Sequence, residues 1–167
     1  MSAIEAKKSA ARKCAVTLAG APGAVLRPDR RLLKAAAEYF AARSAARSGL
    51  VFREVTIVLQ DDADSDAAHR AVMDVAGATD VITQRYDSMP GEEPGVYGEL
   101  YVNVERAVAA ALARADWGPE KELLLYVAHG MDHLAGEDDF DESGRRRMRR
   151  RELGWLRDFC AMSGVQR

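Results

Sequence analysis

Apolar positions recur with two spacings along the chain, and each spacing predicts a different element. From Phe52 to Leu59 the residues FREVTIVL are β-branched and alternate between apolar and polar, which predicts a half-buried strand. From Pro28 to about Ser48 the apolar residues instead return every three or four positions. This spacing predicts an amphipathic helix that ends at Gly49.

The same criteria predict the remaining elements. Three more strands are expected, at 14–18, 78–83 and 98–104. Four more helices are expected: near 65–75, at 105–115, from 119 or 120 toward the glycine at 136, and at 142–162. A turn at 20–23 and a loop at 88–95 contain the glycine and proline residues that interrupt these patterns. We therefore expect an α+β fold, with a small mixed sheet of about four strands and helices on its faces.

Composition restricts the class of protein. A chain of 167 residues with 48% hydrophobic and 30% charged residues is expected to form one globular domain over 1–167, with frayed residues at 1–11. Two cysteines are too few for a disulfide framework, which favours the reducing cytoplasm. There is no apolar run of the ~18 residues that a membrane span needs, and the first residues lack the apolar segment of a signal peptide. We expect a cytoplasmic protein with no membrane partner.

One stretch carries candidate metal chemistry. His129 and His133 are four residues apart, so a helix places both imidazoles on one face, where they can share a metal ion. Gly136 follows at a position where the helix can end in a left-handed turn. Asp139 can then return a carboxylate to the same ion, since carboxylate oxygen is a normal zinc ligand. The predicted metal ligands are His129, His133 and Asp139, the predicted cofactor is Zn²⁺, and the predicted helix is of the zincin type.

The spacing is that of the metzincin zinc proteins, with one difference. Peptidases with the H-E-x-x-H motif carry a general-base Glu directly after the first His, and here Gly130 occupies that position. A zinc peptidase is therefore the less favoured interpretation, and Gly130 is expected to leave room beside the metal for a nucleic-acid backbone. Asp132 is open to three interpretations: it orients an imidazole, accepts a proton, or is a solvated helix acid. For the His pair itself, the competing interpretation is ordinary surface chemistry or packing.

Charge is distributed unevenly, although the net charge is only −2. Residues 132–142 hold six acids, and six arginines follow between Arg145 and Arg151. Over nearly two helical turns these arginines cannot all face one way. They either contact RNA phosphates, which supplies affinity without base readout, or form a solvated face paired with the acidic loop. His69 stands alone on a predicted helix, where surface exposure or packing is favoured over metal ligation.

Four segments resemble, in the same order, the YbeY family of bacterial metal-dependent endoribonucleases of ribosomal RNA maturation. Residues 78–83 (ATDVIT) are similar to the family's Thr-Asp-Val-Leu-Ser strand, and residues 98–103 (GELYVN) to its Gly-Asp/Glu-Ile strand. Residues 129–139 (HGMDHLAGEDD) resemble His-Gly-x-Leu-His-Leu-x-Gly-Tyr-Asp-His. Met148 and Glu152 resemble the family's Met-x-x-x-Glu near the C-terminus.

The resemblance implies a zinc-dependent endoribonuclease in which metal-activated water attacks a phosphodiester, with ribosomal RNA or ribosomal particles as partners. It assigns no catalytic residue other than the metal ligands. The chain departs from the family pattern at six positions: Asp139 for the third His ligand, Glu137 for Tyr, Asp132 for Leu, Gln84 and Arg85 for Phe-Pro, and Met73 for an Arg. These departures keep open a non-catalytic RNA-binding or ribosome-assembly factor with a structural or vestigial metal site.

Overall fold

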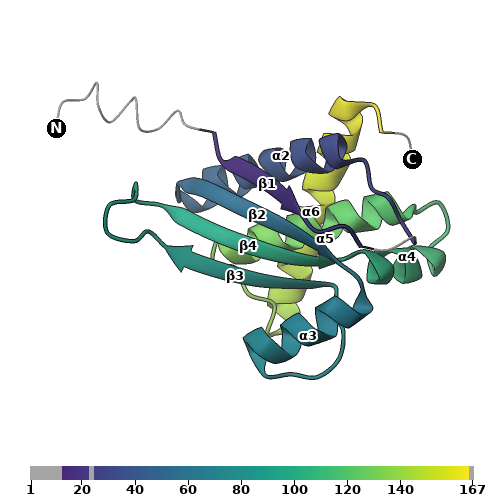
Figure 1. The fold of residues 1–167 in the computed structure, drawn as a ribbon. Helices are drawn as coiled ribbons and strands as arrows, with labels where there is room; N and C mark the ends of the chain where they lie inside the picture. Colours follow the sequence, from purple (N-terminus) through teal and green to yellow (C-terminus); the bar gives the residue numbers. More distant parts are fainter. Residues whose placement is uncertain (1–12, 23–24, 166–167) are drawn as a thin grey trace.

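In the computed structural model, the described residues are 13–22 and 25–165, and they form four strands and five helices (Figure 1). The strands are β1 (Ala15–Ala19), β2 (Phe52–Gln60), β3 (Val81–Asp87) and β4 (Val96–Asn103). The helices are α2 (Arg30–Ser48), α3 (Asp62–Met73), α4 (Val104–Leu112), α5 (Pro119–Leu134) and α6 (Glu142–Ser163). The expected α+β class is confirmed. The expectation for 1–11, and part of the expected turn at 20–23, lie outside the described residues.

The strands form one mixed sheet in the order β1-β2-β4-β3. β1, β2 and β4 run parallel, and β3 pairs antiparallel with β4. Parallel neighbours need crossover connections, which α2 supplies between β1 and β2. Because β4 lies between β2 and β3, it is hydrogen-bonded on both sides.

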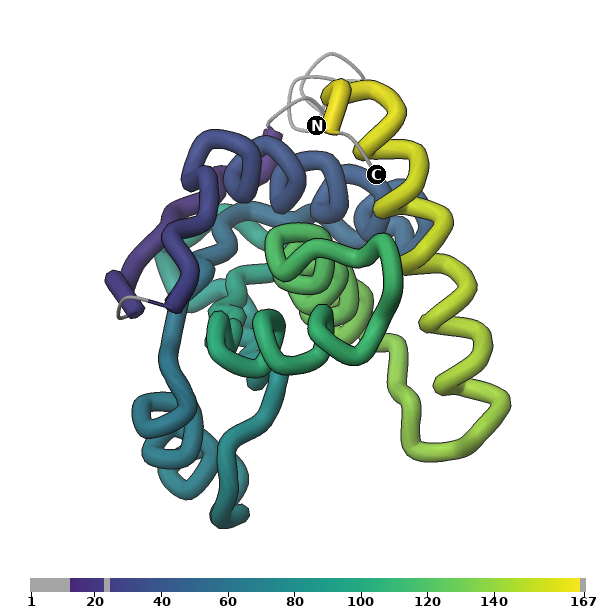
Figure 2. The backbone as a smooth tube through the Cα atoms, turned by 90° about the vertical axis from the view of Figure 1, so that its right-hand side faces the viewer, coloured from purple at the N-terminus to yellow at the C-terminus, as the bar shows by residue number. Residues whose placement is uncertain are grey.

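One face of the sheet carries the core. Its side chains include Val55, Ile57, Leu100 and Val102, all with no exposed surface. The long helices α2, α5 and α6 lie on this side, and the ribbon shows no helix of the described residues over the opposite face (Figure 1). Figure 2 shows α5 end-on, enclosed by α2, α4 and α6. The long helices thus gather on one face, where the sequence had suggested helices on both.

Capping residues explain why α3 differs from the expected 65–75. The helix starts at Asp62 because the Asp61 side chain accepts a hydrogen bond from the backbone N–H of Asp64 at 2.8 Å. It ends at Met73 because Asp74 adopts a left-handed conformation with φ 55°. No helix of the described residues is long and apolar enough to cross a membrane.

β3 also departs from expectation. The strand expected at 78–83 begins at Val81 and continues to Asp87, because each of its residues pairs with β4. Thr79 instead lies in the connection from α3, where its backbone N–H donates to the Ser65 hydroxyl at 3.1 Å and its carbonyl accepts from it. The other strands and helices agree with the expected bounds to within about three residues at each end.

Candidate metal centre

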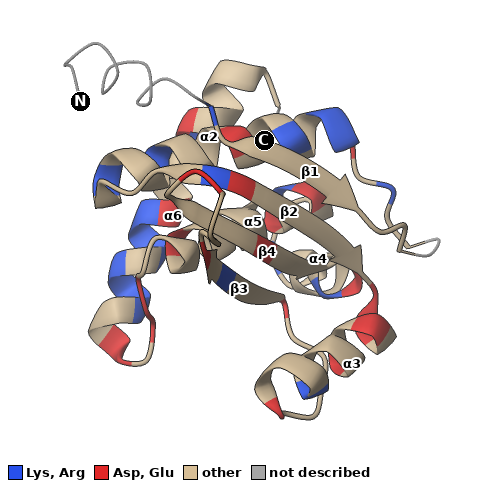
Figure 3. Ribbon diagram, turned by 60° about the vertical axis from the view of Figure 1, so that its left-hand side comes forward, with Lys and Arg blue, Asp and Glu red and all other residues tan. Residues whose placement is uncertain are grey.

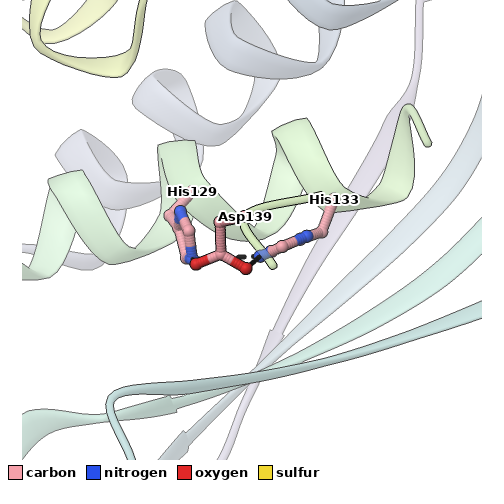
Figure 4. A group of neighbouring side chains, drawn as sticks. All are labelled: His129, His133 and Asp139. Carbon is pink, nitrogen blue, oxygen red and sulfur yellow. Dashed lines mark hydrogen bonds and ion pairs between the residues drawn. The ribbon is translucent and has the colours of Figure 1, made fainter. Parts of the chain in front are cut away.

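The two histidines lie one turn apart near the end of α5, and their rings meet at the same place (Figure 4). Their Nε2 atoms are 3.0 Å apart. After α5 the chain turns at Gly136, with φ 90°, and brings Asp139 back to the helix. Its Oδ2 is 3.9 Å from Nε2 of His129 and its Oδ1 is 3.8 Å from Nε2 of His133. The structure therefore brings together the three residues that the spacing predicted, with one donor atom from each within 4.8 Å of the others.

Each imidazole is held at Nδ1 by an oxygen acceptor. Nδ1 of His129 lies 2.8 Å from Oε1 of Glu152, and Nδ1 of His133 lies 2.9 Å from the carbonyl oxygen of Glu137. Both Nδ1 atoms therefore donate, which leaves the Nε2 lone pairs directed at the shared space. Two such lone pairs repel each other unless a proton or a metal cation lies between them.

The donor set fits a transition-metal ion. Tetrahedral zinc with bonds of 2.0–2.1 Å requires neighbouring ligand nitrogens about 3.3 Å apart, close to the spacing of the two Nε2 atoms. Without a metal, one imidazole must hold the proton between them. Burial lowers the pKa of His129, but the hydrogen bond to the Glu152 carboxylate and the negative charges of Glu152, Asp80 and Asp139 together outweigh burial, and the pKa lies above its ordinary value.

Sequence reasoning noted Glu152 only as part of a tail motif and assigned it no role. The side chain is 2% exposed and comes from α6, which packs beside α5. The periodicity of α6 indicates that Glu152 lies on its buried face. Glu152 follows Met148 by four residues and precedes Leu156 by four, and both neighbours are buried. An acid on the apolar face of a helix needs a partner, and here the partner is His129.

Asp132 is bound by arginines and is not one of the three candidate ligands. Its carboxylate is fully buried and accepts hydrogen bonds from Nη2 and Nε of Arg151 at 2.7 and 2.9 Å. Nη2 of Arg47, from α2, lies 3.5 Å away. Burial raises the pKa of this carboxyl, and the Arg151 guanidinium opposes that rise. Asp132 is therefore a buried ion-pair partner. It is not the solvated helix acid considered from the sequence, and its side-chain partners are arginines instead of an imidazole.

Glu137 joins this ion pair to the loop that carries the third candidate ligand. Its carboxylate accepts hydrogen bonds from Arg151 at 2.8 Å, Arg47 at 2.9 Å and Arg147 at 3.1 Å. The Arg151 hydrogen bond, with help from Arg147, holds the pKa of Glu137 at about 2. The backbone N–H of Glu137 also donates to the carbonyl of Asp132 at 3.2 Å. Two departures from the family pattern, at 132 and 137, are thus parts of one network.

The six arginines between Arg145 and Arg151 separate into two groups. Four have partners: Arg147 and Arg151 bond Glu137 of the preceding loop, and Arg145 donates to the backbone carbonyls of Asp139 and Phe140 in the same loop. Arg146 bonds Glu142 within α6. Arg149 and Arg150 form no ion pair with the described residues. Arg149 also lines a cleft next to His129, so the phosphate-contact interpretation applies to it.

Gly130 lies beneath the candidate site and faces the sheet. A Cβ atom at this position would be 2.7 Å from Cδ2 of Leu100 on β4. In the same way, a Cβ at Gly98 of β4 would be 2.6 Å from Cδ2 of Leu134. These two glycines allow α5 to approach the sheet closely. The expectation that Gly130 leaves room for a nucleic-acid backbone is wrong, because the residue after His129 turns toward β4.

Two clefts open beside the three candidate ligands. A cleft of about 350 Å³ lies on the His129 side and is lined by residues of α5 and α6, including Arg149 and Glu152. A cleft of about 460 Å³ lies on the His133 side, between α3, β3 and the loop after α5. Figure 3 shows α3 and this loop as separate projections at the same end of the molecule. Asp139 lines both clefts.

Comparisons with known proteins identify the family of the chain. The family model described as endoribonuclease YbeY matches residues 27–159. A Rhodopirellula baltica protein named endoribonuclease YbeY is 35% identical over 115 residues, which cover 68% of this chain and 58% of that protein. A Desulfitobacterium hafniense protein of the same name is 33% identical over 108 residues, covering 59% of this chain and 67% of that protein. The chain thus spans less than two thirds of the first relative.

The fold also resembles a solved structure. A solution structure of a protein from Thermotoga maritima aligns with a TM-score of 0.57 over 88% of this chain and 90% of that chain. At 21% identity this similarity supports the fold alone. The family match runs from just before α2 into α6.

Proposed function

The chain belongs to the endoribonuclease YbeY family, and from that premise we propose that it is a zinc-dependent endoribonuclease. Its proposed substrate is ribosomal RNA, free or in ribosomal particles, which rests on the family resemblance. Its proposed metal ligands are His129, His133 and Asp139, which rest on the geometry of this chain. The proposed reaction is hydrolysis of a phosphodiester bond.

One observation carries the metal assignment. Both imidazoles donate from Nδ1 to fixed oxygens, so both Nε2 lone pairs point into one space beside a carboxylate. Packing alone does not require two acceptors to face each other at 3.0 Å. Two nitrogens and one oxygen also leave a fourth tetrahedral position open, as catalytic zinc sites do.

The residues of the site have separate roles in the proposed reaction. A bound zinc ion supplies Lewis-acid activation of water, which becomes ionisable near pH ~7. Glu152 fixes the tautomer of His129 and increases its basicity as a ligand. Arg149, exposed in the adjacent cleft, is placed to contact a phosphate of the substrate. The chain thereby combines metal binding with positioning of the anionic backbone.

A zinc peptidase is disfavoured by the orientation of residue 130. A general base introduced there would collide with Leu100 of the sheet, because even its Cβ would lie 2.7 Å from Cδ2 of Leu100. The alternative function, a non-catalytic RNA-binding factor, can hold the same metal as the nuclease. The two functions therefore differ only in whether the bound RNA is cut. The two experiments that follow separate metal binding from turnover.

Elemental analysis tests the metal. Purified, metal-replete protein is expected to contain about one zinc per chain, and His129→Ala and His133→Ala are each expected to lose most of it. His69→Gln is the matched control, because His69 is the third histidine of the chain and lies outside the candidate ligand group. Absence of a stoichiometric transition metal from the parent protein would exclude the proposed site.

Cleavage of ribosomal RNA tests the activity. The holoprotein is expected to cut a ribosomal RNA fragment, and His133→Ala is expected to lose the cutting along with the metal. A protein that holds one zinc per chain, binds the RNA and leaves it intact would establish the non-catalytic factor in place of the nuclease.

A further inference from the structure

The cleft on the His133 side has a chemical character of its own. Its walls come mainly from three elements, which are α3 with His69 and Met73, the loop after α5 with residues 136–140, and β3 with Val81, Ile82, Thr83 and Arg85. His133 and Asp139 also line it, so it opens directly onto the candidate metal centre. At about 460 Å³ it falls in the size range of pockets that hold small ligands.

Two exposed apolar side chains line this cleft. Phe140 is 90% exposed and Met73 is 58% exposed, and Phe140 is the most exposed of the large hydrophobic side chains among the described residues. Neither side chain is needed to fill the core. Exposed apolar side chains that gather at a concave site are typical of surfaces that receive a ligand.

Polar groups complete the same cleft. His69 faces the carbonyl oxygen of Gly77 with Nδ1 at 2.8 Å, which makes Nδ1 the donor and leaves Nε2 free. Arg85 donates to the carbonyl oxygen of Leu134 at 3.2 Å, and its side chain is 37% exposed. A ring nitrogen and a guanidinium beside an aromatic side chain are suited to a ligand that combines a flat apolar ring with a hydroxyl or phosphate.

We propose that this cleft binds the nucleobase of the nucleotide next to the scissile phosphate, with the base stacked on Phe140 and packed against Met73. His69 and Arg85 contact the attached ribose or phosphate. The inference deepens the proposed function and rests on it for the identity of the ligand as RNA. It assigns the base to the His133 side of the metal centre and leaves the cleft with Arg149 for the continuing backbone.

The contrast between the two clefts supports this assignment. The only Phe, Tyr or Trp ring lining the His129-side cleft among the described residues is Tyr126, which is 8% exposed and donates its hydroxyl to the carbonyl of Arg106 at 3.3 Å. Tyr126 is therefore held in the core and cannot present a face for stacking. Phe140 has no such restraint, because it lies on the loop with nearly its whole ring in solvent.

The position of Met73 adds a second reason. The family resemblance places an Arg at 73, and this chain has an apolar side chain there. An apolar wall favours contact with a base over contact with a phosphate. The positively charged side chain that lines this cleft is instead Arg85, from β3.

Binding without cleavage tests the proposal. The probe is a short RNA with phosphorothioate linkages, which resist hydrolysis, and one 2-aminopurine whose fluorescence falls when it stacks. The holoprotein is expected to quench the probe. Phe140→Ala is expected to raise the Kd about tenfold or more and to abolish the quenching, because stacking of one base on an aromatic ring is worth ~1–3 kcal/mol. Phe140→Trp is expected to keep the Kd and the quenching of the parent protein.

Leu112→Ala is the matched control, because Leu112 is 85% exposed at the end of α4 and lines neither cleft. An equal loss in Leu112→Ala, or unchanged Kd and quenching in Phe140→Ala, would overturn the subsite. Because binding is measured apart from cleavage, Phe140-dependent quenching by a protein that never cuts RNA keeps the subsite and rejects the nuclease. Cleavage by the parent protein with no effect of Phe140→Ala on binding rejects the subsite alone.

Discussion

The two histidines of α5 differ in what holds them, although one helix carries both. His129 donates to the buried carboxylate of Glu152, which comes from α6. His133 donates to the backbone carbonyl of Glu137, which comes from the loop. A carboxylate brings a full negative charge to its imidazole and a carbonyl brings only a dipole, so the two imidazoles are held by acceptors of different charge. Helix packing therefore positions one ligand, and the arginine network around the loop positions the other.

Removal of Asp139 is expected to have the largest effect on zinc affinity, because its two oxygens face both histidines. Asp139→Ala should weaken zinc binding by more than the ~10–100-fold typical of groups that only orient a ligand. Asp139→His restores a nitrogen donor and should retain the metal. Competition with a chromophoric chelator measures both. If Asp139→Ala binds zinc as tightly as the parent protein, Asp139 is not a ligand.

Changes at Glu152 test the His129 half of the comparison. Glu152→Ala removes the acceptor and should weaken zinc binding ~10–100-fold. Glu152→Gln keeps an acceptor oxygen without the charge and should lose less. The same chelator competition applies, with Asp158→Asn, a partly exposed acid of α6, as the control. Equal losses in the Gln and Ala variants would show that charge, and not the hydrogen bond, is what His129 requires.

Changes at Arg151 test the His133 half. Arg151→Gln should weaken zinc binding by less than Glu152→Ala, because Arg47 and Arg147 still hold Glu137. It should, however, destabilise the fold by ~3 kcal/mol, since Asp132 is left buried with a weakened partner. Chemical denaturation measures the stability. Adding Asp132→Leu should recover much of the loss, and failure to do so would mean that the two side chains are not energetically coupled.

The candidate ligands could be predicted from the sequence because their geometry is local. A helical spacing of four residues and one glycine turn determine where His129, His133 and Asp139 lie. The expectation that Gly130 leaves room for a nucleic-acid backbone is wrong for a related reason. Spacing shows which residues share a face with His129, but the surface that the next residue meets depends on how α5 packs on β4.

The partners of the ligands could not be predicted, because they depend on tertiary packing. Glu152 reaches His129 only after α6 lies against α5, and Arg47 reaches Asp132 from a helix far earlier in the chain. The bounds of β3 differ from the expected ones because pairing with β4 extends the strand to Asp87, beyond the apolar segment that predicted it.

The proposed ligands and the groups that bond their imidazoles all lie between residues 129 and 152, within α5, one loop and α6. The entropic cost of closing so short a segment is slightly lower than that of joining β1 to β2 or β2 to β4. Contacts of low sequence separation also form faster than long-range strand pairs. We therefore expect the hairpin of α5 and α6 to assemble early in folding, so that zinc can stabilise a folding nucleus before the parallel strands of the sheet have paired.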